Sequence, residues 1–236
     1  MNELKEPRLE WRDEHTPVSQ TFDDVYFSPR DGLAESRYVF IEGIGGPSAW
    51  KNKQHFTIGE TGFGTGLNFL ATWQEWKKQA KPGQRLTYVS IEAFPLSKDQ
   101  IKQSLLQWAE LRNVNDRFLE LYPKATPGKH VLEYGNENVT LILLFGDVTE
   151  MLSKYLELVD AWFLDGFSPR KNPEMWNEKV YQQLARLSKT GTKLATFTAA
   201  GHVRRGLERV GFLMDKRKGF AYKKEHLVGE FAVKKD

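Results

Sequence analysis

The chain of 236 residues is long enough for one α/β domain with a full hydrophobic core. Hydrophobic residues make up 40% and charged residues 28%, and no apolar run is long enough to span a membrane, so we expect a globular protein that does not bind membranes. The net charge is only +3, and the absence of cysteine excludes disulfides, thiolate metal sites and a cysteine nucleophile. The N-terminus is charged throughout and resembles neither a secretory signal nor a transit peptide, which predicts a cytoplasmic protein.

Residues 1–50 differ in pattern from the rest of the chain. The stretch QTFDDVYFSPRDGLAESRYVFIEG (20–43) mixes aromatic and acidic residues and then predicts a short helix near 33–42. We expect residues 1–50 to cover the ligand edge of a Rossmann-like core formed by residues 51–236, within a single domain.

Strand-like and helix-like stretches alternate from Phe56 onward, which is typical of a parallel sheet with crossover helices. The predicted strands are 55–60, 85–92, 138–147, 161–165 and 192–198, and the predicted helices are 66–80, 97–111, 148–157, 174–188 and 200–210. Residues 127–144 predict a hairpin that turns at Gly135-Asn136. Residues 211–233 predict two strands joined by a basic turn, as a terminal antiparallel hairpin.

The stretch GETGFGTGLNFL follows the first predicted strand and begins a helix. A dinucleotide-binding G-x-G-x-x-G motif would need a small residue at position 67, which is Leu67; the pattern here is Glu60, Gly62, Gly64, Gly66. A carboxylate at the end of this strand would repel a pyrophosphate but would hold an ammonium group. The loop therefore favours the methionine end of S-adenosylmethionine (SAM).

Two further acids end predicted strands, where ligands bind in open α/β sheets. Glu92 can accept both ribose hydroxyls of SAM, and Asp147 can receive the adenine amino group. Each acid also fits a helix cap, and Asp147 before VTEML is a good N-cap candidate. Three acids in this order, together with the glycines, favour SAM over capping alone.

The fourth strand leads into DGFSPRKNPEMW, where the methyl acceptor would bind. Asp165 can hold an amine, and Phe167 can stack on a base or shield the sulfonium; the alternative is a strand-ending turn in which Asp165 caps and Phe167 packs. Without a cysteine the acceptor should already be nucleophilic, namely an amine, a ring nitrogen or an oxygen. Asp165 would be a weak base unless burial raises its pKa, so we expect it mainly to position the amine. The five histidines show no ligand spacing, and we expect no metal.

Residues 204–226 contain eight Lys or Arg and three Asp or Glu, a local net charge of +5. A basic face of this kind suits a polyanion such as RNA, although a solvated helix and hairpin surface would have the same composition. The residues concerned are Arg204, Arg205, Lys216, Arg217, Lys218, Lys223 and Lys224.

Four motifs carry a resemblance over nearly the whole chain: QTFDDVYFSPRDGLAESRYVF, GETGFGTGLNFL, DAWFLDGFSPRKNPEMW and ATFTAAGHVRRGLERVGF. The sequence resembles the methyltransferase domain of bifunctional bacterial tRNA 5-methylaminomethyl-2-thiouridine biosynthesis proteins. The resemblance implies a class I SAM-dependent methyltransferase fold and N-methylation of 5-aminomethyl-2-thiouridine at the tRNA wobble position. The partner would then be the anticodon stem-loop of tRNA, bound by the basic C-terminal face.

The same resemblance implies roles for individual residues. Those at the SAM site would be Glu60, Gly62, Gly64, Glu92 and Asp147, and those at the acceptor Asp165 and Phe167. Tyr26 and Phe27 would lie near the cofactor or the base, or would instead anchor the N-terminal segment in the core.

In the fused form of these proteins a flavin-dependent oxidase follows the methyltransferase. The 236 residues have no second dinucleotide motif, so we expect no FAD here and an oxidase supplied by another domain or partner. Three other functions stay open: N-methylation of another RNA or small-molecule amine, a non-catalytic SAM- or RNA-binding module, and, with least support, a nicotinamide-dependent dehydrogenase.

Overall fold

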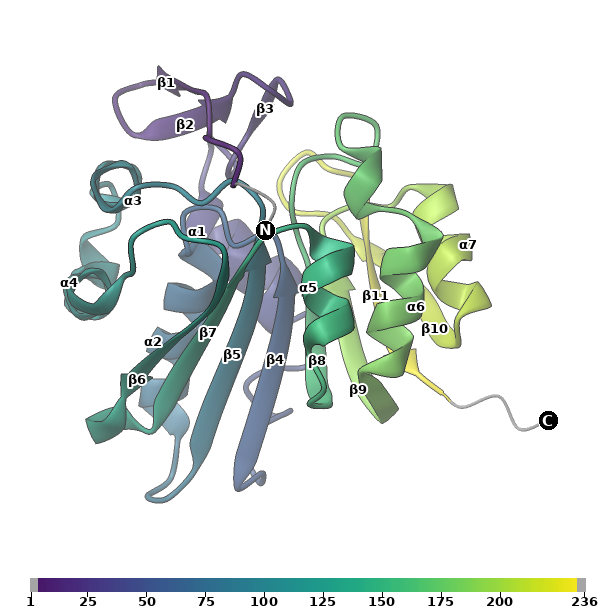
Figure 1. The fold of residues 1–236 in the computed structure, drawn as a ribbon. Helices are drawn as coiled ribbons and strands as arrows, with labels where there is room; N and C mark the ends of the chain where they lie inside the picture. The colour runs from purple at the N-terminus through teal and green to yellow at the C-terminus, as the bar shows by residue number, and fades with distance from the viewer. Residues whose placement is uncertain (1–3, 233–236) are drawn as a thin grey trace.

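A computed structural model describes residues 4–232 and shows an eight-stranded sheet with helices on both faces (Figure 1). The strand order is β10-β11-β9-β8-β4-β5-β7-β6. The strands are β4 (His55–Thr61), β5 (Arg85–Glu92), β6 (Gly128–Tyr134), β7 (Val139–Phe145), β8 (Val159–Leu164), β9 (Ser188–Thr196), β10 (Phe212–Lys218) and β11 (Glu225–Phe231).

The central strands β7, β5, β4, β8 and β9 pair in parallel. The edges are antiparallel: β6 pairs with β7, and β11 with β9 and β10. The predicted mostly parallel sheet with a terminal antiparallel hairpin is confirmed. The hairpin predicted before the third parallel strand also forms, and a 3₁₀ turn over Gly135–Glu137 connects β6 to β7.

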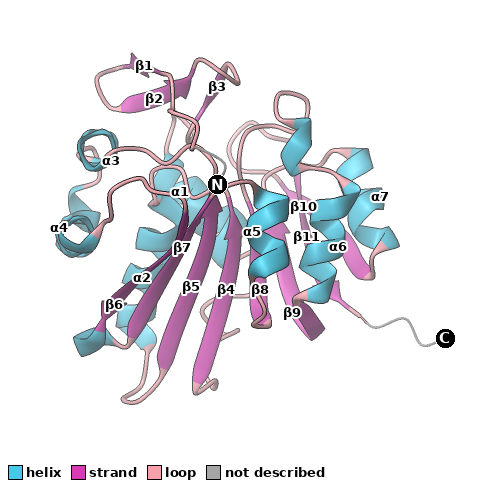
Figure 2. Cartoon of the chain, viewed as in Figure 1, coloured by secondary structure: helices cyan, strands magenta, loops and turns pink. Residues whose placement is uncertain are grey.

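Helices cover both faces of the sheet (Figure 2). They are α2 (Leu67–Gln79), α3 (Lys98–Leu105), α4 (Arg112–Leu121), α5 (Val148–Lys154), α6 (Glu178–Arg186) and α7 (Gly201–Arg209). The single helix predicted over 97–111 is wrong, because α3 ends at Leu105, Trp108 takes a non-helical backbone conformation, and α4 follows as a separate helix. No helix within residues 4–232 is long and apolar enough to cross a membrane.

The N-terminal segment contains a small antiparallel sheet that the sequence did not predict. Its strands are β1 (Leu9–Arg12), β2 (Thr16–Ser19) and β3 (Asp24–Val25). The sheet lies beyond the end at which the central parallel strands finish (Figure 1). The helix expected near 33–42 is present as α1 (Gly32–Ser36) followed by a π-helical turn, Arg37–Ile41.

Two hydrophobic clusters lie on the two faces of the large sheet. On β4, Phe56 and Ile58 belong to the cluster that includes α2, whereas Trp162 and Leu164 of β8 belong to the cluster under α5, α6 and α7. Because both faces are covered, most residues of the central strands are buried, polar ones included. The buried carboxyl group of Glu60 on β4 therefore needs hydrogen-bond partners.

Candidate active site

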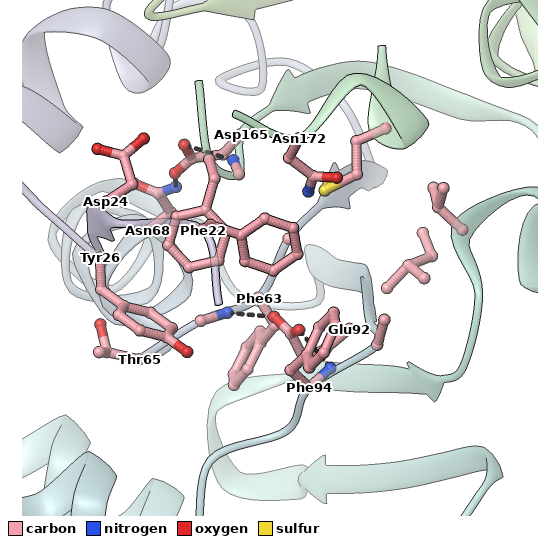
Figure 3. A pocket seen from close by; sticks show the side chains of 18 of the residues that line it. Phe22, Asp24, Tyr26, Phe63, Thr65, Asn68, Glu92, Phe94, Asp165 and Asn172 are labelled. Atoms are coloured by element: carbon pink, nitrogen blue, oxygen red, sulfur yellow. Dashed lines mark hydrogen bonds between the residues drawn. The ribbon is translucent and has the colours of Figure 1, made fainter. Parts of the chain in front are cut away.

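A cavity of about 1210 Å³ opens at the carboxyl ends of β4, β5, β7 and β8. Its walls come from the loops that follow these strands, from residues 21–29 of the N-terminal segment, and from Tyr222 and Lys223 of the β10–β11 turn. The volume is sufficient for a ligand of nucleoside size. Figure 3 shows some of the side chains that line it.

The glycine loop forms one wall. Gly62 has φ +80°, and a Cβ atom there would lie 3.0 Å from the Cα of Gly166 in the loop after β8. Gly64 has φ +53°, and a Cβ atom would lie 3.2 Å from the ring of Tyr26. Both glycines line the cavity, whereas Gly66 is the left-handed N-cap of α2 and shapes the loop from behind. The loop therefore requires glycine both for its backbone conformation and for its close contacts.

Glu92, at the end of β5, lines the cavity and holds the glycine loop. Its Oε2 accepts from the backbone N–H of Gly64 at 2.8 Å, and its Oε1 accepts from the N–H of Phe94 at 2.8 Å (Figure 3). Burial raises the pKa of Glu92, against the lowering effect of these N–H donors. A carboxylate already occupies the N–H that a phosphate would need, which disfavours a dinucleotide ligand.

Asp147 lines the cavity after β7 and is exposed. Its Oδ1 accepts from the backbone N–H of Glu150 at 3.0 Å, so it caps α5. The capping alternative is thus correct for one carboxylate oxygen. The contact of Asp147 with an adenine amino group stays a prediction.

Glu60, which the sequence predicts to contact the ligand directly, lies behind the cavity wall. Its side chain is fully buried and does not line the cavity, because Asn68 of α2 lies in front of it. Asn68 Nδ2 donates to Glu60 Oε1 at 2.9 Å, and Ser90 Oγ donates to Glu60 Oε2 at 2.6 Å. Burial raises the pKa of Glu60 to about 8, even though both hydrogen bonds lower it.

Asp165 follows β8 and lines the cavity, and its contact with a methyl acceptor stays a prediction. Its Oδ1 accepts from the N–H of Gly166 at 2.8 Å and its Oδ2 from Asn68 Nδ2 at 2.7 Å (Figure 3). Desolvation by the surrounding protein raises the pKa of Asp165 to about 7, although the two donors oppose the shift. A carboxyl group that titrates near neutral pH can act as a general base.

Aromatic rings from three segments meet at the cavity. Phe167 stacks on Phe22 with centroids 4.7 Å apart and meets the Tyr26 ring edge-on at 5.1 Å, while Phe22 contacts Phe94 at 5.3 Å. Phe167 and Tyr26 therefore pack against neighbours and also line the cavity. Phe27 also lines the cavity, while its ring packs on Trp108 in the core. The roles of Phe22 and Phe94 had no sequence signal, because they depend on how the N-terminal segment folds over the sheet.

An ion pair joins the N-terminal segment to the β10–β11 turn at the cavity wall. Lys223 Nζ lies 2.7 Å from Glu35 Oε1 and 5.3 Å from the centre of the Phe197 ring. All three residues line the cavity. Sequence reasoning missed Glu35, which looks like an ordinary polar residue of a short helix.

The predicted basic residues lie on α7, β10 and the β10–β11 turn, mostly exposed. Acids pair with some of them: Arg204 with Glu208, and Lys216 with Glu225. These pairs reduce the positive charge of the face without removing it. Among the described residues, no group of three or more His, Asp or Glu is arranged to hold a metal ion.

The cavity, the glycine loop and the strand-end acids together define a Rossmann-like site for a nucleoside ligand without phosphate. The family model described as S-adenosyl-L-methionine-dependent methyltransferase matches residues 109–232, and the chain belongs to this family. The acids and glycines that line the cavity fit SAM, whose methionine end is cationic and whose nucleoside carries hydroxyl and amino donors.

The chain is similar to curated proteins named tRNA 5-methylaminomethyl-2-thiouridine biosynthesis bifunctional protein MnmC. It is 46% identical to that of Aliivibrio fischeri, over 97% of this chain and 35% of the relative, and 43% identical to that of Magnetococcus marinus, over 94% and 33%. The chain thus spans about a third of the length of these relatives. The crystal structure of MnmC2 from Aquifex aeolicus has the same fold, with a TM-score of 0.77 at 23% identity over 95% of this chain and 71% of that one.

Proposed function

We propose that this chain transfers the methyl group of SAM to the aminomethyl nitrogen of 5-aminomethyl-2-thiouridine at the wobble position of tRNA, giving 5-methylaminomethyl-2-thiouridine. The main support for this substrate is the 43–46% identity to the bifunctional relatives over almost the whole chain. The reaction would take place in the cytoplasm, where tRNA is modified. We place the flavin-dependent step that would supply the aminomethyl group in a separate domain or protein.

The observation that carries the chemistry is the Asp165 carboxyl group at the acceptor end of the cavity. An aliphatic amine is mostly ammonium at neutral pH and cannot attack until it loses a proton. The raised pKa of Asp165, about 7, suits it to accept that proton, whereas a carboxyl of ordinary pKa would be a weak base. We therefore assign Asp165 both roles: it positions the amine and accepts its proton.

SAM supplies a methyl carbon on a sulfonium, which needs no metal to be transferred. The amine nitrogen would use its lone pair to form the N–C bond while the C–S bond breaks, with the electron pair of that bond left on sulfur. The protein contributes in-line placement of the amine, since holding two reactants in this geometry lowers the barrier substantially. Phe167 and Tyr26 would form the wall that keeps water from the reacting atoms and offers aromatic faces to a sulfonium or a base.

The contacts that hold SAM would come from the loop and the strand ends. Gly62 and Gly64 would let the methionine part approach the backbone closely. Each Glu92 oxygen already accepts one N–H and has a second lone pair, which would accept a ribose hydroxyl. Asp147 would accept from the adenine amino group through the oxygen that does not cap α5. Glu60 would act only from behind the cavity wall.

The tRNA would approach across α7 and the β10–β11 turn. Lys223 lines the cavity and Lys224 follows it in the turn, while the exposed Lys218 and Arg205 lie at the end of β10 and on α7. We expect these residues to form one basic face beside the acceptor. Phosphate contacts from such a face would fix the orientation of the anticodon stem-loop and make binding depend on salt.

The decisive experiment is to incubate the purified protein with SAM and tRNA that carries 5-aminomethyl-2-thiouridine, and to weigh the nucleosides after digestion. A gain of one methyl group on that nucleoside by the wild type, and not by Asp165→Asn, would establish the reaction. Calorimetry in parallel shows whether the protein binds SAM, and so distinguishes a protein that does not bind the cofactor from one that does not accept this substrate. If SAM binds and no methyl group is gained, the substrate assignment is wrong and another amine must be sought.

A further inference from the structure

Two carboxyl groups from neighbouring strands, Glu60 on β4 and Asp165 directly after β8, share one hydrogen-bond donor under α2. Asn68 Nδ2 donates to Glu60 Oε1 at 2.9 Å and to Asp165 Oδ2 at 2.7 Å. None of the ion pairs in the described part of the chain includes either acid. Since an amide nitrogen has two hydrogens, Asn68 can serve both carboxyl groups at once.

The orientation of the Asn68 amide is fixed from its other side. Ser36 Oγ of α1 donates to Asn68 Oδ1 at 2.5 Å, so the NH₂ group must face the two acids. Asn68 itself is buried near the start of α2, directly after the glycine loop. The N-terminal segment therefore holds the amide that in turn holds Asp165.

We propose that Asn68 is a positioning residue for methyl transfer: it holds the Asp165 carboxyl toward the acceptor and couples its protonation to that of Glu60. The inference rests on the proposed function, in which Asp165 accepts the proton of the amine.

Glu60 and Asp165 differ in protonation state because the groups around them differ. Two carboxyl oxygens that accept from the two hydrogens of one amide lie on the order of 5 Å apart, close enough for one negative charge to oppose the other. Glu60 has only neutral donors, Asn68 and Ser90, and Tyr88 is a neutral neighbour on β5. Glu60 therefore keeps its proton while Asp165 ionises.

Asp165 has additional help in ionising. The N–H of Gly166 donates to it, and the charges near it are those of Lys223 on the β10–β11 turn and Glu35 on α1, which pair with each other. Asn68 donates to both carboxyl groups and so lowers the pKa of each. Without Asn68, Asp165 would hold its proton to higher pH and would lose the contact that orients its Oδ2.

The test is the pH profile of methyl transfer at saturating SAM for the wild type and Asn68→Leu, which has a similar volume. We expect the acid limb of the profile to move up by about one pH unit. The rate then falls roughly tenfold more at pH 6 than at pH 9, where a smaller loss remains because Asp165 is no longer oriented, while SAM affinity stays within about threefold. Asn115→Leu, which replaces another buried asparagine on α4 that does not line the cavity, is the matched control and should leave the profile in place. An equal loss at every pH would overturn the proposal.

Carboxyl ¹³C NMR titration of the protein alone tests the coupling without any substrate. Besides Glu92, whose pKa is also raised by burial, two carboxyl groups should titrate well above the usual range; the resonance of higher midpoint should disappear in Glu60→Gln and that of lower midpoint in Asp165→Asn. Both midpoints should move up in Asn68→Leu, and midpoints that stay in place would overturn the coupling. A wild type that shows the two titrations but methylates no tRNA would refute the proposed function and leave the coupling standing.

Discussion

Glu60 offers a prediction about stability that does not depend on the substrate. Its carboxyl group is fully buried, has no cationic partner within the described residues, and has a pKa of about 8 where the ordinary value is 4.5. The folded chain therefore retains a proton that the unfolded chain releases above pH 4.5. The contribution of this group to stability is full below that pH and is lost as pH rises through about 8.

The size of the effect follows from the two pKa values. A difference between 4.5 and about 8 corresponds to about 5 kcal/mol of unfolding free energy lost by the wild type between pH 4 and pH 9. Glu60→Gln keeps the shape of the protonated side chain and cannot ionise, so it removes this dependence. We take the difference in unfolding free energy between the variant and the wild type at pH 4 as the reference. From that reference, the difference should shift in favour of the variant by about 1 kcal/mol at pH 5, about 3 kcal/mol at pH 7 and about 5 kcal/mol at pH 9.

The assay is urea denaturation of both proteins at several values from pH 5 to pH 9, with the difference in unfolding free energy plotted against pH. Glu120→Gln, at an exposed position on α4, is the control and should give a flat line. A flat line for Glu60→Gln as well would mean that Glu60 is ionised in the native protein. The account of the buried pair given above would then be wrong.

Other predictions concern the site directly. Asp165→Asn should lower methyl transfer by at least about 100-fold with SAM affinity nearly unchanged, as measured by single-turnover kinetics and calorimetry. In the wild type the rate should fall about tenfold per pH unit below the Asp165 pKa of about 7, because only the ionised carboxyl accepts a proton; a profile flat down to pH 5 would exclude this role. Gly62→Ala should destabilise the fold by about 1–3 kcal/mol in urea denaturation, since φ is +80° there, while Gly135→Ala, in open space, should cost less. Arg205→Glu with Lys218→Glu should weaken tRNA binding and reduce its salt dependence in a filter assay without affecting SAM binding; an unchanged salt slope would place the RNA elsewhere.

The sequence predicted the parts of the fold that depend on local pattern. The central strands β4, β5 and β7 are short stretches rich in apolar and β-branched residues that end at or just before acids or glycines, so their positions and the edge where the ligand binds could be predicted. The small sheet β1–β3 could not, because its strands are four, four and two residues long and pair only through tertiary contacts. The division between α3 and α4 was missed because the residues around Trp108 contain no glycine or proline to mark the break.

For the candidate site too, the sequence predicts some side chains and misses others. Asp165 and Glu92 could be found because the carboxyl ends of parallel strands meet at one edge. Asn68 was missed, although the signal was present: it is a polar residue in an otherwise apolar first turn of a helix that the sheet must bury. Alternation along β4 also places Glu60 on the same face as Ile58, which packs under α2, but alternation does not say how deep a side chain lies.

The exclusion of a dinucleotide depends on a different acid from the one that first suggested it. The sequence attributes the negative charge at the glycine loop to Glu60, the acid nearest the loop along the chain. In the folded protein Glu92 is the acid that meets the loop, because its Oε2 accepts from the Gly64 N–H, while Glu60 faces Asn68 and Ser90 behind the wall. A phosphate would have to displace the Glu92 carboxylate and lie beside its charge, so the loop still disfavours a pyrophosphate. The ligand class thus follows from strand pairing, which brings β5 next to β4, as much as from the motif itself.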